Sequence, residues 1–205
     1  MKTAMNNQTT KRYSLIWELV GDISEKTLLD IGAGDLPISK GLITKKTLTL
    51  DGDKNNHPDI LCHLTSKEWP VEKELADVII AGEIIEHLDD NLSFLKECHR
   101  ILKKDGRIIL STPNVCSFKN RLKVLFGKLP EYCAGPKRFR DLNHHLTDFN
   151  LPELKKLLGE AGFKTLRAKT NGIVSHSKIF WPLRLTPVSF GEIIIIEAIK
   201  IDKII

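Results

Sequence analysis

Short apolar runs alternate with longer stretches of helical periodicity along this chain of 205 residues. The apolar runs predict strands at Thr27–Ile31, Thr47–Asp51, Asp59–Leu64, Ala76–Ala81, Arg107–Ser111, Lys164–Thr170 and Glu192–Ile199. Apolar residues at helical spacing predict helices at Tyr13–Val20, Ile38–Thr44, Asp89–Lys104 and Leu151–Ala161. Such alternation is typical of an α/β fold with helices on both faces of a sheet. We therefore expect a mostly parallel, seven-stranded sheet.

The stretch Thr112–Asn150 between the fifth predicted strand and the last helix is irregular. Within it Phe118, Leu122, Leu125 and Phe126 recur at helical spacing among basic residues. The spacing predicts an amphipathic helix over the carboxyl edge of the sheet. Its apolar stripe either covers the core or forms a lid over a site; the shortness of the segment disfavours a role at a membrane surface.

Length and composition favour one domain over residues 1–205, with a lid insertion at about residues 113–149. The first ten residues are polar, so we expect no secretory signal. The longest purely aliphatic run is Ile193–Ile196, which is far too short to span a membrane. The four cysteines form no C-x-x-C pair, which favours buried thiols. We expect a cytoplasmic protein.

The net charge of +5 is unevenly distributed. Residues 117–140 contain one acid, Glu131, and seven basic residues: Lys119, Arg121, Lys123, Lys128, Lys137, Arg138 and Arg140. Such a segment either attracts an anionic substrate, RNA or an acidic lipid surface, or is simply a solvated face.

Candidate chemistry begins at the stretch LLDIGAGDLP, residues 28–37. Gly32 and Gly34 flank Ala33 directly after an apolar run, and glycines at the end of a strand let the backbone approach a ligand closely. Asp51 ends the next predicted strand, where a carboxylate can accept both hydroxyls of a ribose. This pattern predicts a nucleotide or nucleoside site.

Two residues separate the candidate cofactors. A dinucleotide fingerprint requires a third glycine where Pro37 stands. Asp30 at the tip of the strand would repel a pyrophosphate, whereas it suits the ammonium of a methionyl group. The turn therefore favours S-adenosylmethionine over NAD.

Five segments in order resemble the class I S-adenosylmethionine-dependent methyltransferases, small-molecule branch. They are LLDIGAGD, TLTLDGDK, ADVIIAGEIIEHL, LKECHRILKKDGRIILSTPN and HHLTDFNLPELKKLLGEAGF, and the resemblance covers about residues 25–170. It implies an enzyme with a Rossmann-like methyltransferase fold.

The resemblance also implies the cofactor contacts. The methionyl part and the sugar would be held by Asp30, Gly32, Ala33 and Gly34, and the ribose hydroxyls by Asp51. The adenine would lie beside Gly52 and Asp53, with His63 and Leu64 following the third strand. The turn of Gly82 and Glu83 would lie by the methionyl sulfur. Two positions depart from the pattern. His63 stands where many members have an acid that contacts the adenine, and Leu36 replaces a glycine of the first motif.

Methyl transfer needs mainly a positioned acceptor, and a base helps only when the acceptor must lose a proton. Glu83 and His87 follow the fourth strand, and His145 matches a histidine that many members carry in the lid. These three are the candidate catalytic residues, although Glu86 and His87 could instead cap the turn. We expect a small-molecule acceptor methylated at a hydroxyl without a metal, and an anionic acceptor would suit the basic segment.

Two alternatives stay open. Glu83, Glu86, His87 and His145 could hold a divalent metal, as in RNA 2′-O-methyltransferases that modify the ends of small RNAs. Alternatively, the chain could be a non-catalytic cofactor-binding subunit. Ala81-Gly82-Glu83-Ile84 in place of an N-P-P-Y type motif disfavours base amino groups as acceptors.

Overall fold

A seven-stranded sheet in the order β3-β2-β1-β4-β5-β9-β6 forms the centre of the computed structural model. Its strands are β1 (Ile23–Ile31), β2 (Thr44–Asp51), β3 (Ile60–Leu61), β4 (Ala76–Gly82), β5 (Leu102–Pro113), β6 (Phe163–Thr170) and β9 (Ile193–Lys200). A separate two-stranded sheet pairs β7 (Val174–Ser175) with β8 (Lys178–Ile179). The structure describes residues 7–131, 133, 145–175, 178–179 and 186–202.

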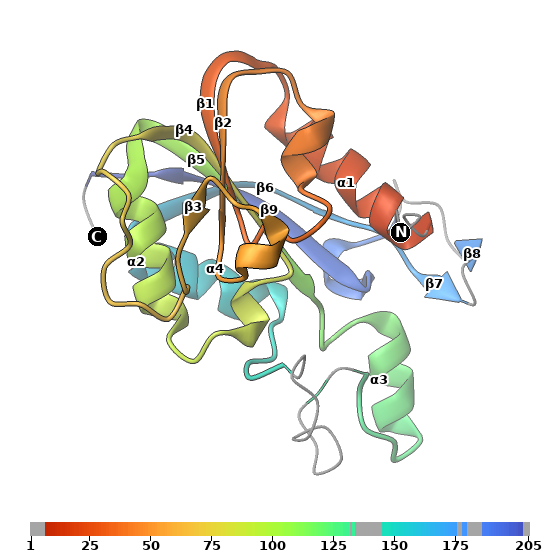
Figure 1. Ribbon diagram of the computed structural model, residues 1–205. Helices are drawn as coiled ribbons and strands as arrows, with labels where there is room; N and C mark the ends of the chain where they lie inside the picture. Colours follow the sequence, from red (N-terminus) through yellow and green to blue (C-terminus); the bar gives the residue numbers. More distant parts are fainter. Residues whose placement is uncertain (1–6, 132, 134–144, 176–177, 180–185, 203–205) are drawn as a thin grey trace.

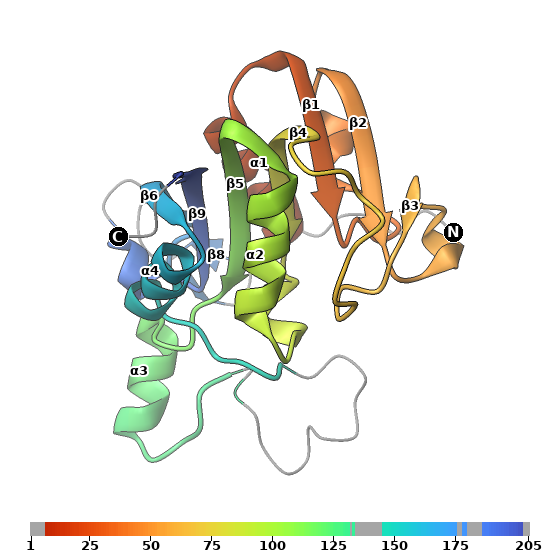
Figure 2. The same cartoon turned by 90° about the vertical axis from the view of Figure 1, so that its left-hand side faces the viewer.

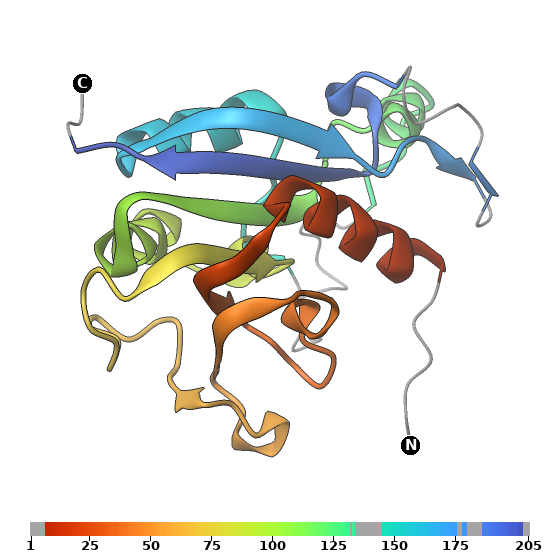
Figure 3. The same cartoon turned by 90° about the horizontal axis from the view of Figure 1, so that it is seen from above.

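The five strands β1 to β5 run parallel, and β9 is antiparallel to both β5 and β6. Figure 3 shows this order from the light blue β6 at one side to the orange β2 and β3 at the other. The strand order reverses between β1 and β4, which is where open α/β sheets bind ligands. The prediction of a mostly parallel, Rossmann-like sheet is confirmed.

Helices cover both faces of the sheet. The described helices are α1 (Asn7–Val20), α2 (Asn91–Ile101), α3 (Phe118–Leu125) and α4 (Leu151–Glu160), with short 3-10 turns η1 (Ile38–Gly41), η2 (Lys54–Asn56), η3 (Ile85–His87) and η5 (Val188–Phe190). Figure 2 shows α2 and α4 in front of the sheet and α1 behind it. Asn150 caps the start of α4, because the Glu153 N–H donates to Asn150 Oδ1 at 2.9 Å.

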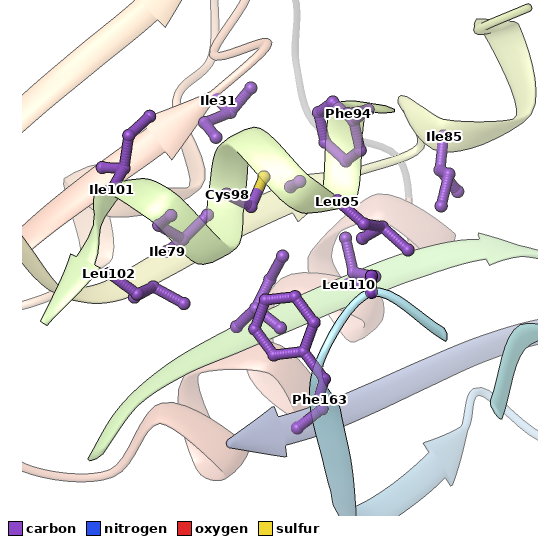
Figure 4. Packing of buried hydrophobic residues seen from close by; sticks show 14 of the residues in the cluster. Ile31, Ile79, Ile85, Phe94, Leu95, Cys98, Ile101, Leu102, Leu110 and Phe163 are labelled. Carbon is purple, nitrogen blue, oxygen red and sulfur yellow. The ribbon is translucent and has the colours of Figure 1, made fainter. Parts of the chain in front are cut away.

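The core lies in two layers, one on each face of the sheet. On the α2 side, Phe94, Leu95 and Cys98 pack against the strands and Phe163 (Figure 4). On the other face, Ile16 and Leu19 of α1 pack against β-strand residues such as Leu28 and Ile80. Cys62 and Cys98 are buried as expected, while Cys116 and Cys133 are half-buried. These two layers fix the strands whose ends carry the site.

The predicted helix Ile38–Thr44 is wrong: only η1 forms, and Thr44 already belongs to β2. In a continuing α-helix the Ile38 carbonyl would accept the N–H of Leu42. Here the Trp17 indole N–H donates to the Ile38 carbonyl at 2.9 Å, and the Leu42 N–H bonds to Ser39 instead. A contact from α1 thus ends the helix after one turn.

Two further elements are several residues shorter than the sequence predicts. The helix predicted over Asp89–Lys104 spans only Asn91–Ile101, because Leu102 begins β5. The strand predicted over Asp59–Leu64 is reduced to Ile60–Leu61.

The predicted amphipathic helix forms as α3, but its stripe does not cover the core. Leu125 and Phe126 are 75% and 73% exposed. Figures 1 and 2 show α3 standing out from the body of the molecule.

Candidate active site at the carboxyl edge of the sheet

The glycine turn after β1 has a backbone that only glycine adopts easily. Gly32 and Gly34 have φ values of +64° and +56°. A Cβ on Gly32 would lie 2.2 Å from Cδ1 of Ile84, so the turn after β4 packs directly on this glycine. At Gly34 nothing lies within 4 Å of the corresponding position, and Ala33 between them is buried. The turn is therefore closed on the Ile84 side and open at Gly34.

Asp51 joins the glycine turn to the loop after β2. Its Oδ2 accepts the Gly34 N–H and its Oδ1 accepts the Asp53 N–H, both at 2.8 Å. The side chain is buried, and each oxygen keeps a further lone pair. Asp51 can therefore fix the turn and still accept hydrogen bonds from a ligand.

Asp30 is turned into the protein. It is 1% exposed, and its Oδ2 accepts the Ser39 N–H at 2.8 Å. Burial raises the pKa of Asp30, and the backbone N–H groups of Ser39 and Ile38 oppose that rise. Asp30 thus holds the start of η1, and its contact with a methionyl ammonium stays a prediction.

The residues assigned to the adenine lie in two loops that meet. A Cβ on Gly52 would lie 3.0 Å from Nδ1 of His63, so the loops after β2 and β3 are in contact there. Asp53 and His63 are exposed and Leu64 is half-buried. This part of the candidate site faces solvent.

Glu83 directly follows Gly82, the last residue of β4, with a left-handed φ of +58°. Its N–H donates to the Ser111 carbonyl, and the Ser111 hydroxyl donates to Glu83 Oε1, each at 2.9 Å. Burial raises the pKa of Glu83, and the charge of Arg12 and the Ser111 hydroxyl oppose that rise. Backbone strain of this kind in a non-glycine residue is concentrated at functional sites.

Glu86 is 1% exposed and only half satisfied. The Thr112 hydroxyl donates to its Oε2 at 2.9 Å, whereas its Oε1 has no hydrogen-bond partner among the described residues. Burial, followed by the charge of Glu83, raises the pKa of Glu86 to about 8. Its backbone carbonyl accepts the N–H groups of Leu146 and Thr147, which brings the segment after His145 onto η3.

The two candidate histidines meet across this contact. The rings of His87 and His145 pack edge to face, with centroids 5.0 Å apart. Ligand atoms of Glu86, His87 and His145 all lie within 4.8 Å of one another. Glu83 is not part of this group, and its carboxylate accepts from the Ser111 hydroxyl. The structure therefore brings together three of the four residues that the sequence singled out.

Arg12 of α1 is a site residue that sequence reasoning missed. Its Nη1 lies 3.5 Å from Glu83 Oε2, and its buried Nε has no partner among the described residues. The neighbouring Tyr13 hydroxyl donates to the Leu36 carbonyl at 2.7 Å, which fixes α1 beside the glycine turn. Nothing in the local sequence signals this role, because it depends on how α1 packs across the sheet.

Comparison with known proteins identifies the family of this chain. A family model described as a methyltransferase domain matches residues 5–168. The chain belongs to this family. S-adenosylmethionine is the methyl donor that membership assigns to it, as the sequence predicted.

Relatives of this methyltransferase domain are moderately similar. A probable S-adenosylmethionine-dependent methyltransferase of Mycolicibacterium smegmatis is 33% identical over 103 residues, which cover 50% of this chain and 34% of the relative. A demethylmenaquinone methyltransferase of Staphylococcus aureus is 28% identical over 171 residues, covering 76% of this chain and 65% of the relative. The chain thus spans about a third of the first relative's length and just under two thirds of the second's.

Solved structures share the fold. A crystal structure from Thermotoga maritima, described as a S-adenosylmethionine-dependent methyltransferase and possible histamine N-methyltransferase, superposes with a TM-score of 0.67 at 19% identity. The match covers 93% of this chain and 88% of that one. Within the described part of the methyltransferase domain, the helices are too short or too polar to cross a membrane.

Proposed function

We propose that this methyltransferase domain transfers a methyl group from S-adenosylmethionine to a hydroxyl of a small-molecule acceptor. The observation that carries the proposal is the His87–His145 pair at the end of β4, next in the sheet to the glycine turn that ends β1. Because β1 and β4 are parallel neighbours, a donor at one strand end and an acceptor at the other would lie side by side.

The cofactor supplies a methyl group on a cationic sulfonium, and the residues present fit its other parts. Asp51 has free lone pairs for the two ribose hydroxyls, next to the open side of Gly34. The loops of Gly52 and Asp53 and of His63 and Leu64 would flank the adenine. S-adenosylmethionine carries no pyrophosphate, so the site needs no group that binds one.

We assign Arg12 to the methionyl carboxylate. A methionyl group carries an ammonium and a carboxylate, so its site needs a carboxylate and a cation. Glu83 supplies the carboxylate, and Arg12 beside it has a buried Nε still available to donate. A guanidinium suits a carboxylate because its donors form a rigid fork.

His87 or His145 would accept the proton that the acceptor hydroxyl loses. Each ring is half-buried, and an imidazole can act as a base near neutral pH. Glu83, held by Ser111 and Arg12, would orient the methionyl side of the site. The name of the Staphylococcus aureus relative denotes a small-molecule acceptor, which supports this branch of the family.

Transfer of label from S-adenosylmethionine into metabolite extracts tests the proposal. We expect labelled small molecules with the wild-type chain and a transfer rate at least about 100-fold lower in H87A or H145A. The control is H57A, because His57 is exposed at the C-terminal end of η2; its rate should not change. Activity should survive chelation. Cofactor binding without any transfer would instead favour a non-catalytic subunit.

A metal-dependent RNA 2′-O-methyltransferase is the second candidate. The close approach of Glu86, His87 and His145, with Glu86 Oε1 unpartnered among the described residues, favours it. Carboxylate and imidazole ligands together suit several divalent metals. Under this alternative, chelation and E86A both abolish methylation of an RNA end, and RNA binding falls steeply with salt.

A further inference from the structure

The end of α3 and the turn after it carry apolar side chains that face solvent. Val124, Leu125, Phe126 and Leu129 are 57%, 75%, 73% and 70% exposed. We call these four residues the apolar tip. Figures 1 and 2 both show α3 projecting away from the sheet, so the apolar tip lies at an extremity of the described structure. Clusters of exposed apolar residues commonly mark interaction sites.

Hydrogen bonds and ion pairs between α3 and the chain that follows it keep the apolar tip exposed. Glu131, on the returning chain, accepts from Lys119 at 2.9 Å and from Lys123 at 2.7 Å. The Glu131 N–H also donates to Asn120 Oδ1 at 2.8 Å. Within the turn, the Lys128 N–H bonds to the Lys123 carbonyl. Helix and returning chain thus form a closed hairpin that points its apolar side chains outward.

The root of α3 is fixed to the body of the protein by other residues. The rings of Phe118 and Phe190 lie 6.1 Å apart, and the Arg121 guanidinium lies 4.6 Å from the Phe190 ring centre. Arg121 also donates to the carbonyls of Cys116 and Ser189. These contacts use the first half of α3, so packing against the body does not account for the apolar tip.

The hairpin that carries the apolar tip has a net positive charge. Residues 117–131 contain Lys119, Arg121, Lys123 and Lys128 against Glu131. Lys119 and Lys123 pair with Glu131, and Arg121 contacts the body of the protein, while Lys128 is exposed within the apolar tip. Exposed apolar side chains next to basic ones are the pattern of segments that bind at a membrane interface, and the exposure of the apolar tip outweighs the shortness of the segment. Anionic lipids attract each basic residue near their surface.

We propose that the apolar tip and its basic neighbours dock this protein peripherally on an anionic lipid bilayer. Leu125 and Phe126 would enter the interfacial region, while Lys128 faces the lipid headgroups. A second copy of the chain fits this surface less well, because a symmetric contact would bring two positively charged hairpins together. An RNA partner would contact the basic residues but leave the aliphatic side chains of the apolar tip exposed to water. The inference does not depend on the methyl acceptor.

Cosedimentation with vesicles tests this inference without any measurement of activity. We expect binding to vesicles of phosphatidylcholine mixed with phosphatidylglycerol, and little binding to phosphatidylcholine alone. A double variant, L125S/F126S, should lower the partition coefficient at least about tenfold, because two apolar anchors are lost. The matched control is I43S, which removes an apolar side chain that is 83% exposed just before β2. I43S should bind as the wild type does.

The charge contribution is tested with K128Q, which should lower the partition coefficient about fivefold. Added salt should weaken binding in the same direction. Thermal unfolding of each variant verifies that it is folded. Failure of the wild type to sediment with anionic vesicles would overturn the proposal, as would equal binding by L125S/F126S. A concentration-dependent dimer that L125S/F126S abolishes would assign the apolar tip to a second copy and also overturn it.

Discussion

Arg12 and Glu83 link the first helix to the turn after β4, with Arg12 Nη1 3.5 Å from Glu83 Oε2. The contact places a cation and a carboxylate at the point where the strand order of the sheet reverses. Two groups of opposite charge beside a glycine turn match the two charged groups of a methionyl moiety. This relationship makes α1 part of the site as well as part of the core.

We predict that R12Q weakens binding of S-adenosylmethionine about tenfold, ~1.4 kcal/mol, because the methionyl carboxylate loses a charged donor. Binding of methylthioadenosine, which lacks that carboxylate, should not change. K11Q is the control, because the neighbouring Lys11 donates to the Asn171 carbonyl instead. Calorimetric titration of both ligands into the wild type, R12Q and K11Q measures these affinities. Equal weakening of both ligands in R12Q would mean that Arg12 only packs α1.

The glycine turn gives a matched pair of substitutions. G32A and G34A both force a left-handed alanine, which costs about 1–2 kcal/mol, but only G32A also meets Ile84. Denaturant unfolding should therefore show the larger loss of stability for G32A. In an I84A background the two losses should become similar. A larger loss of stability in G34A than in G32A would contradict the packing of Ile84 against Gly32.

The stability of the protein should depend on Glu86 through pH. The carboxyl has a pKa of about 8 when folded against 4.5 as its ordinary value, so between these values the folded chain holds a proton that the unfolded chain has released. The free energy of unfolding then decreases as pH rises through this window, by at most about 1.4 kcal/mol per pH unit. E86Q, which mimics the protonated form, should lack this decrease.

Denaturant titrations at several pH values measure the difference between E86Q and the wild type. That difference should grow in favour of E86Q up to about pH 8 and stay constant for the exposed control E25Q. A pH-independent difference for E86Q would contradict the burial of a carboxyl with only one of its oxygens hydrogen-bonded. Stabilisation of the wild type but not E86Q by a divalent metal would favour the metal-dependent alternative.

Most of the sheet could be predicted from the sequence because its strands are apolar runs bounded by turns. The carboxyl ends of β1, β2 and β4 then placed the glycine turn, Asp51 and Glu83 on one edge. The prediction of a helix at Ile38–Thr44 failed because a distant contact overrides local preference. Trp17 occupies the carbonyl that would continue the helix at Ile38, and no local pattern announces that contact.

The candidate site divides in the same way. Glu86, His87 and His145 could be found from motif spacing, and the structure brings them together. Arg12 could not, since its position depends on the packing of α1 against the glycine turn. Periodicity also predicted α3 correctly but could not say whether Leu125 and Phe126 face protein or solvent.

Calorimetric titration of S-adenosylmethionine into the wild type, D51A and D22A tests the central claim most directly. Asp51 accepts backbone N–H groups at the carboxyl end of β2, whereas Asp22 does so just before β1, at the opposite edge. We predict saturable one-to-one binding by the wild type and D22A, and a loss of about 1–3 kcal/mol in D51A, because the ribose hydroxyls lose their acceptor. Unchanged affinity in folded D51A, or no binding by the wild type, would contradict the assignment of the cofactor to this edge of the sheet.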